Sequence, residues 1–294
     1  MATRNATISQ RKRSSDATRA PLTYGQDFKF TLWTADPELA ARADAAGVDR
    51  IGLDLETLGK HERQKGLATW ISPHREDQLP ALRKAIRTNK LFCRTNPINP
   101  ASQDEIERLI GHGVEVLMLP MFTVSAEVEK FVRYIDGRAT VVLLLENRTA
   151  ADNVNDIVRV AGIDDVHIGL NDLTLSLKMS NRFAVMSSPL MDRISDAVLG
   201  AGIRFGVGGV GRVVVGDDTL PIPSDLIYAQ YPRLRATAAL ISRAFFGGDS
   251  SFVDLTAEVR KSRERLDWWH ARTPAEREAA HQQFRERTSA CATW

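Results

Sequence analysis

The amino-acid sequence predicts an α/β protein built as a (β/α)8 TIM barrel. From residue 28 onward, short β-branched or apolar runs alternate with longer amphipathic segments, and eight such runs can be counted. Several amphipathic segments end in a glycine that is followed at once by the next apolar run. Alternating strands and helices imply parallel strands joined by right-handed crossovers. A doubly wound open sheet has the same alternation, but eight similar units favour the closed barrel.

The eight predicted strands are apolar or β-branched runs over residues 28–33, 50–55, 91–94, 115–119, 140–145, 165–169, 204–207 and 225–229. The predicted helices have apolar residues at three- and four-residue spacing and cover 37–46, 78–87, 103–110, 125–135, 150–160 and 189–199. Asp36 and Ser102 are expected to be helix N-caps. Gly47, Gly113 and Gly202 are expected to end helices in the left-handed conformation.

Composition divides the chain into three parts. The first twenty residues hold five basic residues against the single acid Asp16 and few large apolar residues, so residues 1–25 are predicted to be a disordered basic tail. A transit peptide is disfavoured there because an amphipathic apolar face is missing. Residues 26–250 would form the barrel, and residues 251–294 a helical C-terminal extension that packs on the barrel or mediates oligomerisation.

Charge and apolar content exclude several classes of protein. The 294 residues carry a formal charge of +2, so no long-range field would recruit nucleic acid or acidic lipid. No apolar stretch of about 18 residues is present, which argues against membrane insertion. Cys93 and Cys291 lie far apart in the sequence, and a disulfide framework or a cysteine metal site is not expected. We expect a cytoplasmic protein without nucleic-acid or membrane partners.

Charged residues collect where the predicted strands end. Glu146 closes the fifth strand and Asp172 follows the sixth, while Asp54, Glu56 and Arg94 end the second and third. In a barrel these ends meet at one mouth. Two carboxylates from neighbouring strands at the rim of an apolar core suit a divalent ion such as Mg²⁺ or Mn²⁺. For each residue taken alone, a helix cap or a loop ion pair is the alternative.

The same strand ends resemble, over about residues 28–246, those of the HpcH/HpaI aldolase and citrate lyase beta-subunit family. The matching motifs are Asp54-Leu55-Glu56, Phe92-Cys93-Arg94, Met118-Leu119-Pro120, Leu145-Glu146 and Gly169-Leu170-Asn171-Asp172-Leu173. That family has a phosphoenolpyruvate/pyruvate-type barrel and contains metal-dependent carbon–carbon lyases. The resemblance implies that Glu146 and Asp172 bind the metal and that Arg94 contacts the 2-oxo group of a pyruvate-like substrate.

The resemblance further implies a class II pyruvate-type aldolase, which forms or cleaves a 4-hydroxy-2-oxo acid through a pyruvate enolate. Backbone groups at Gly169 and Asn171 would hold the substrate carboxylate at a helix start. Gly208 would lie in a tight turn that admits substrate, a reading preferred over a phosphate or CoA loop. A metal-bound water molecule positioned by Asp54 or Glu56 is one candidate for the base.

Departures from the aldolase branch leave the base unassigned. That branch has Gly-Glu-His after the strand-two aspartate, whereas this chain has Leu55-Glu56-Thr57. His61 and His74 could substitute, although an exposed loop position is expected for both. Lys60 and Lys65 are expected in solvent, and no lysine occupies the desolvated strand position that a Schiff base needs. Alternatives are a citrate-lyase-like acyl-CoA ester lyase and a metabolite-binding barrel that lacks a base.

Three aromatic residues stand out in the charged C-terminal extension. Trp268, Trp269 and Phe284 lie among arginine and glutamate residues in a helical pattern. Such side chains need a partner, either the barrel wall or a neighbouring subunit. Because relatives in the resembled family assemble as trimers or hexamers, a homo-oligomer is predicted.

Overall fold

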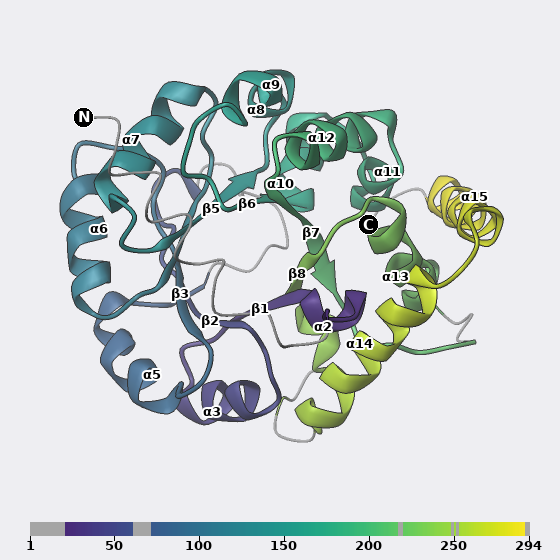
Figure 1. Cartoon of the computed structure of the whole chain (residues 1–294), viewed down its shortest axis with the longest axis horizontal. Helices are drawn as coiled ribbons and strands as arrows, with labels where there is room; N and C mark the ends of the chain where they lie inside the picture. Colours follow the sequence, from purple (N-terminus) through teal and green to yellow (C-terminus); the bar gives the residue numbers. More distant parts are fainter. Residues whose placement is uncertain (1–20, 61–71, 217–219, 248–249, 251–252, 292–294) are drawn as a thin grey trace.

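The eight strands form a closed parallel barrel in the order β1 to β8, with β8 paired to β1. The structure is a computed structural model that describes residues 21–60, 72–216, 220–247, 250 and 253–291. Figure 1 shows the barrel ringed by helices, with α14, Leu255–His270, between α13, Ser224–Arg233, and α3, Pro37–Ala45, and with α15, Pro274–Ala290, outside α13. The predicted (β/α)8 barrel is confirmed.

The strands span β1 Lys29–Trp33, β2 Arg50–Asp54, β3 Lys90–Arg94, β4 Val116–Leu119, β5 Thr140–Leu145, β6 Asp165–Ile168, β7 Arg204–Val210 and β8 Ala238–Ile241. The first seven overlap the predicted strands, and β7 extends three residues beyond its predicted end. The eighth prediction, over 225–229, is wrong because this segment lies in helix α13, Ser224–Arg233. Tyr228 and Tyr231, one helical turn apart, are both buried there, and the Tyr231 hydroxyl donates to the carbonyl oxygen of Val207 at 3.3 Å.

The helices before the extension span α2 Tyr24–Asp27, α3 Pro37–Ala45, α5 Leu79–Ala85, α6 Ser102–Gly111, α7 Ser125–Ile135, α8 Arg148–Asp152, α9 Val154–Ile157, α10 Leu170–Ser176, α11 Arg182–Met186, α12 Pro189–Gly200 and α13, with 3₁₀ turns η1 Glu76–Gln78 and η2 Arg243–Phe245. The helix predicted over 150–160 is interrupted at Asn153, whose side-chain amide donates to the carbonyl oxygen of Thr123 at 2.9 Å.

The expected helix signals are partly confirmed. Asp36 caps α3 by accepting a hydrogen bond from the Glu38 amide, as predicted. Ser102 is not an N-cap, because it lies inside α6 and its hydroxyl accepts a hydrogen bond from the Asn99 amide at 2.9 Å. Glycines 47, 113 and 202 have φ values of +80°, +82° and +75°, as expected for residues that end helices in the left-handed conformation.

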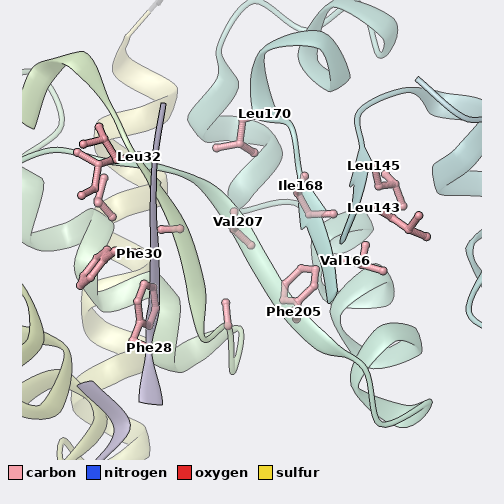
Figure 2. Close-up of a cluster of buried hydrophobic side chains, with 14 of the residues drawn as sticks. Phe28, Phe30, Leu32, Leu143, Leu145, Val166, Ile168, Leu170, Phe205 and Val207 are labelled. Carbon is pink, nitrogen blue, oxygen red and sulfur yellow. The ribbon is translucent and has the colours of Figure 1, made fainter. Parts of the chain in front are cut away.

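Residues on strands β3, β4 and β5 alternate between two apolar layers. The outer layer packs against the helices, and Figure 2 shows part of it, including Phe30, Leu32, Leu143, Leu145, Val166 and Ile168. A separate cluster fills the barrel interior and consists of Phe92, Val116, Met118, Val142 and Leu144, with Trp33 against it. Since side chains alternate along a strand, Arg94 and Glu146, each two residues beyond an inner residue, face the interior at the mouth.

Ion pairs occupy the opposite, N-terminal end of the barrel. Asp165 of β6 pairs with Arg50 of β2, and the Arg204 Nε atom lies 3.6 Å from its other oxygen. Arg263 of α14 donates to the carbonyl oxygens of Phe28 and Gly47 at 2.7 and 2.9 Å. This end is therefore held by paired charges that tie the extension to the barrel.

The C-terminal extension consists of α14, Leu255–His270, and α15, Pro274–Ala290. The Trp269 indole donates to Asp225 at 2.9 Å, and the fully buried Phe284 ring meets the Phe183 ring edge-on at 6.2 Å. Trp268 is 40% exposed and has the guanidinium groups of Arg265 and Arg272 within 3.7 and 4.3 Å of its ring centroid. All three aromatics thus find partners within the chain, Trp268 while staying partly exposed, and the homo-oligomer stays a prediction.

Two further features concern the cysteines and the helices. Cys93 and Cys291 are both free thiols. Among the helices that the structure describes, none combines the length and the apolar character needed to cross a membrane.

Candidate active site at the barrel mouth

Asp54 and Arg94 form a two-bond fork at the ends of β2 and β3, where they are partners in the strand register. The Arg94 Nε and Nη2 atoms donate to the two carboxylate oxygens of Asp54, both at 2.8 Å. Burial acts to raise the pKa of Asp54, but the charges and hydrogen bonds of Arg94 and Lys60 outweigh it and hold that pKa well below its usual range. Asp54 is therefore ionised and fixes the plane of the guanidinium.

Lys60 lies in the same cluster, so the expectation that it is in solvent is wrong. Its side chain is 3% exposed, and its Nζ atom lies 2.7 Å from Asp54 Oδ2 and 4.0 Å from Glu56 Oε2. The two carboxylates offset the cost of burying the ammonium group. Lys65 and His61 lie outside the described residues.

Glu56 and the turn that follows it are held by neighbours on β3 and beyond. The Arg94 Nη1 atom lies 3.1 Å from Glu56 Oε2, so all three guanidinium nitrogens face carboxylates. The Asn96 Oδ1 atom accepts hydrogen bonds from the amides of Thr57 and Leu58 at 2.9 and 3.0 Å, and from the Thr57 hydroxyl at 3.2 Å. This contact ties the Thr57 side chain to Asn96.

His74 reaches the site through the backbone of Asp54. The Asp54 amide donates to His74 Nδ1 at 3.1 Å. Because a backbone amide can only donate, Nδ1 carries no proton, and the proton of the neutral ring is on Nε2. Burial lowers the pKa of His74, which favours this neutral form. The expected exposed loop position is wrong, since His74 is half-buried beside the cluster.

Glu146 is a buried carboxyl group with few partners. Its Oε1 atom accepts a hydrogen bond from the Met121 amide at 3.2 Å, and its Oε2 atom lies 4.0 Å from Arg94 Nη1. Met121 has a φ of +54°, an uncommon conformation for a non-glycine residue. Burial raises the pKa of Glu146 to about 8, Arg94 opposes the rise, and Glu56 and Asp172 add to it. The site thus favours a proton, or another cation, on this carboxyl group.

Asp172 lies in the first turn of α10, half-buried and close enough for its charge to act on Glu146. Gly169, which precedes α10, permits this approach: a Cβ atom there would lie 2.8 Å from the Cβ and Oε2 atoms of Glu146. Two neighbouring carboxyl groups, one buried and hard to ionise, match what a divalent cation stabilises. Among the described residues no group of three or more His, Cys, Asp and Glu side chains could hold a metal, so water or substrate oxygens would complete the coordination.

The other predicted substrate-binding residues lie near this site without an established role in it. Asn171 is exposed, and its Oδ1 atom lies 3.5 Å from Arg182 Nη1. Gly208 has a φ of +51°, and a Cβ atom there would lie 2.5 Å from Leu170 Cδ1. Packing therefore accounts for this glycine. The tight turn expected at Gly208 is wrong, because this residue lies within strand β7, whose pairing is irregular between residues 206 and 209.

Trp33 completes the mouth and was not singled out from the sequence. Its ring centroid lies 4.6 Å from the Arg94 guanidinium carbon, a cation–π contact. The buried indole nitrogen has no hydrogen-bond partner within the described part of the chain. The available sequence signal is its position at the end of β1, next to β2, which ends in the site residue Asp54.

Comparison with protein-family models matches residues 29–218 to the HpcH/HpaI aldolase/citrate lyase family. The chain belongs to this family. The matched range contains every residue of the mouth described above, from Trp33 to Asp172. A search of curated protein sequences finds no match.

Solved structures of the family share the fold. A HpcH/HpaI aldolase/citrate lyase family protein from Burkholderia cenocepacia J2315 is 16% identical with a TM-score of 0.58, over 89% of this chain and 98% of that one. The citrate lyase beta subunit from M. tuberculosis, complexed with oxaloacetate and magnesium, is 17% identical with a TM-score of 0.53, over 83% and 98%. The protein CitE from Mycobacterium tuberculosis, in complex with magnesium and pyruvate, is 16% identical with a TM-score of 0.53, over 88% and 98%.

Proposed function

We propose that this protein is a divalent-metal-dependent carbon–carbon lyase that forms or cleaves a 4-hydroxy-2-oxo acid through a pyruvate enolate. The observation that carries the proposal is Glu146, a buried carboxyl group whose pKa is raised to about 8 and which feels the charges of both Arg94 and Asp172. A group that resists ionisation in the protein alone, beside a second carboxylate, indicates that a cation belongs there.

Glu146 and Asp172 would hold Mg²⁺ or Mn²⁺, since both ions prefer carboxylate oxygen ligands. The ion, when bound, supplies a Lewis acid for the negative charge that develops on the substrate oxygen. Membership of the family and the magnesium found with pyruvate or oxaloacetate in two solved relatives support this choice of metal and substrate class.

Arg94 would contribute a fixed positive charge beside that oxygen. Asp54 holds two of its nitrogens, which leaves Nη1 as the nitrogen that faces Glu56 and Glu146. A donor that is already oriented costs no reorganisation when charge develops. Both oxygens of Asp54 accept hydrogen bonds from charged groups, which favours anchoring of Arg94 over positioning of a water molecule. Glu56 would share this anchoring role.

The start of α10 would receive the substrate carboxylate. Gly169 and Asn171 lie at the first turn of this helix, directly beside the two proposed metal ligands. Backbone amides at a helix start carry free N–H groups that favour anions. Gly208 lies against Leu170 of the same helix and would shape this side of the site.

Nuclear magnetic resonance tests the proposal with the purified full-length protein. Mg²⁺ or Mn²⁺ is expected to stimulate exchange of the pyruvate methyl protons with deuterium and decarboxylation of oxaloacetate. Glu146→Gln and Asp172→Asn should abolish both, whereas Glu107→Gln, a change in an exposed carboxylate, should not. If neither reaction occurs with Mg²⁺, Mn²⁺ or Co²⁺, the result would support a non-catalytic binding barrel instead.

Calorimetric titration separates the proposed activity from that of an acyl-CoA ester lyase. In the presence of Mg²⁺ we expect pyruvate and oxaloacetate to bind, with heats that disappear in Glu146→Gln. Binding of acetyl-CoA without binding of either 2-oxo acid would contradict the proposal and favour the thioester reaction.

A further inference from the structure

The ammonium group of Lys60 is buried at the mouth, and the residues that the structure describes use only part of its hydrogen-bonding capacity. It donates one hydrogen bond, to Asp54 Oδ2 at 2.7 Å, and Glu56 Oε2 at 4.0 Å is too distant for another. An ammonium group has three N–H donors, so two find no partner in the described part of the chain. Buried donors are almost always satisfied, which indicates that water or a ligand oxygen binds at this point.

Carbon–carbon cleavage at a hydroxyl-bearing carbon needs a group that takes the hydroxyl proton, and the neighbouring side chains are poorly suited to that task. Arg94 does not give up its proton in proteins. Asp54 already accepts hydrogen bonds on both oxygens. Thr57 is tied to Asn96, and the unprotonated nitrogen of His74 is taken by the Asp54 amide.

We propose that Lys60 is the acid and base of the carbon–carbon step, an inference that rests on the proposed lyase function. In the condensation direction, the enolate carbon attacks an aldehyde carbonyl and leaves an alkoxide. One N–H bond of Lys60 breaks and an O–H bond forms on that oxygen, which leaves a neutral amine held by Asp54. In cleavage, the amine takes the hydroxyl proton, a carbonyl forms, and the electron pair of the broken carbon–carbon bond passes to the enolate.

Glu56 is the competing candidate for this role. It is buried beside Lys60, but its Oε2 atom is paired with Arg94 Nη1 at 3.1 Å. An acid that exchanges protons must leave its ion pair in each cycle, whereas two Lys60 donors have no hydrogen-bond partner among the described residues. A Glu56→Gln variant therefore belongs in the experiment.

Two reactions of the metal-loaded protein distinguish proton transfer by Lys60 from a purely structural role of its charge. Oxaloacetate decarboxylation produces the same enolate by loss of CO₂ and needs no group to take a hydroxyl proton. Condensation of pyruvate with acetaldehyde, glycolaldehyde, glyceraldehyde or glyoxylate needs the acid. Lys60→Arg keeps the charge next to Asp54 but cannot release a proton, and Lys60→Met removes both. Lys84→Arg and Lys84→Met, at an exposed position of α5, are the matched controls.

We expect condensation with the best aldehyde to fall about 10²- to 10⁴-fold in both Lys60 variants, while decarboxylation falls less than about tenfold. Mg²⁺ affinity, measured by calorimetry without substrate, should be retained in Lys60→Arg, as should thermal unfolding. The Lys84 variants should match the parent protein in every measurement.

Three results would overturn the role of Lys60. Condensation that survives in Lys60→Arg would show that the charge alone is needed. Equal loss of condensation and decarboxylation in the Lys60 variants would show that Lys60 holds the site together. If condensation falls and decarboxylation survives in Glu56→Gln but not in the Lys60 variants, the acid would be Glu56. Absence of decarboxylation and of Mg²⁺ binding in the parent protein is a different result, which rejects the proposed lyase itself.

Discussion

Replacing Asp54 with asparagine is expected to destabilise the protein by about 3–5 kcal/mol, the usual cost of removing one partner from a buried ion pair. The Asp54 carboxylate accepts hydrogen bonds from Arg94 Nε and Nη2 at 2.8 Å and from Lys60 Nζ at 2.7 Å. The variant keeps one oxygen acceptor and turns an NH₂ group towards charged donors. Two buried cations would then lose their main counter-charge.

Burial of the three side chains decides how strongly Asp54→Asn destabilises the protein. The side chains of Asp54, Arg94 and Lys60 are 2%, 7% and 3% exposed, so water cannot replace the lost carboxylate. The pair between Arg138 and Glu107 is equally short, at 2.6 Å, but its side chains are 39% and 49% exposed. Exposed pairs contribute about 0–1 kcal/mol, so Glu107→Gln should have little effect.

Urea unfolding followed by circular dichroism measures both changes, together with thermal unfolding. At about 2 °C per kcal/mol for a chain of this size, Asp54→Asn should lower the Tm by about 6–10 °C. The double variant Asp54→Asn, Lys60→Met should recover part of the loss, because it removes one of the stranded cations. If Asp54→Asn were no more destabilising than Glu107→Gln, the argument from burial would be refuted.

Three further outcomes are expected. Magnesium affinity measured by calorimetry should rise with pH, by up to about tenfold per pH unit, and level off above about pH 8. The reason is that the ion competes with the proton that the raised pKa keeps on Glu146. An affinity that does not change with pH would contradict this competition. Gly169→Ala should weaken magnesium binding, since the added Cβ would lie 2.8 Å from Glu146, whereas Gly200→Ala, with nothing within 4 Å, should not; equal affinities would show that the loop adapts. Burial lowers the pKa of His167 from 6.5 to about 4, so the unfolded chain binds more protons between these values and the free energy of unfolding should fall by about 2–3 kcal/mol as the pH drops through that window. A His167→Gln variant should lose this part of the acid sensitivity in urea titrations, and an unchanged acid sensitivity would assign it to other groups.

Local sequence patterns predicted an element correctly where the apolar residues of that segment alone mark its buried side. The central strands are apolar runs whose alternate residues enter the two layers of the barrel, and the helix-ending glycines have the left-handed conformation that their position requires. The prediction of the last strand was wrong because Ala238–Ile241 is short and rich in alanine, so its sequence gives little indication of a strand. Its place is decided by pairing with β7 on one side and β1 on the other.

The sequence by itself determined the barrel and the side chains at the strand ends, because strand period and strand order are enough to bring Asp54, Arg94 and Glu146 to one mouth. Tertiary structure alone decided how these groups are paired. The burial of Lys60 and the position of the proton on His74 depend on the contacts that these two residues make with Asp54, and no residue spacing encodes those contacts. The raised pKa of Glu146 likewise arises from burial and from charges contributed by other strands, which become neighbours only when the barrel closes.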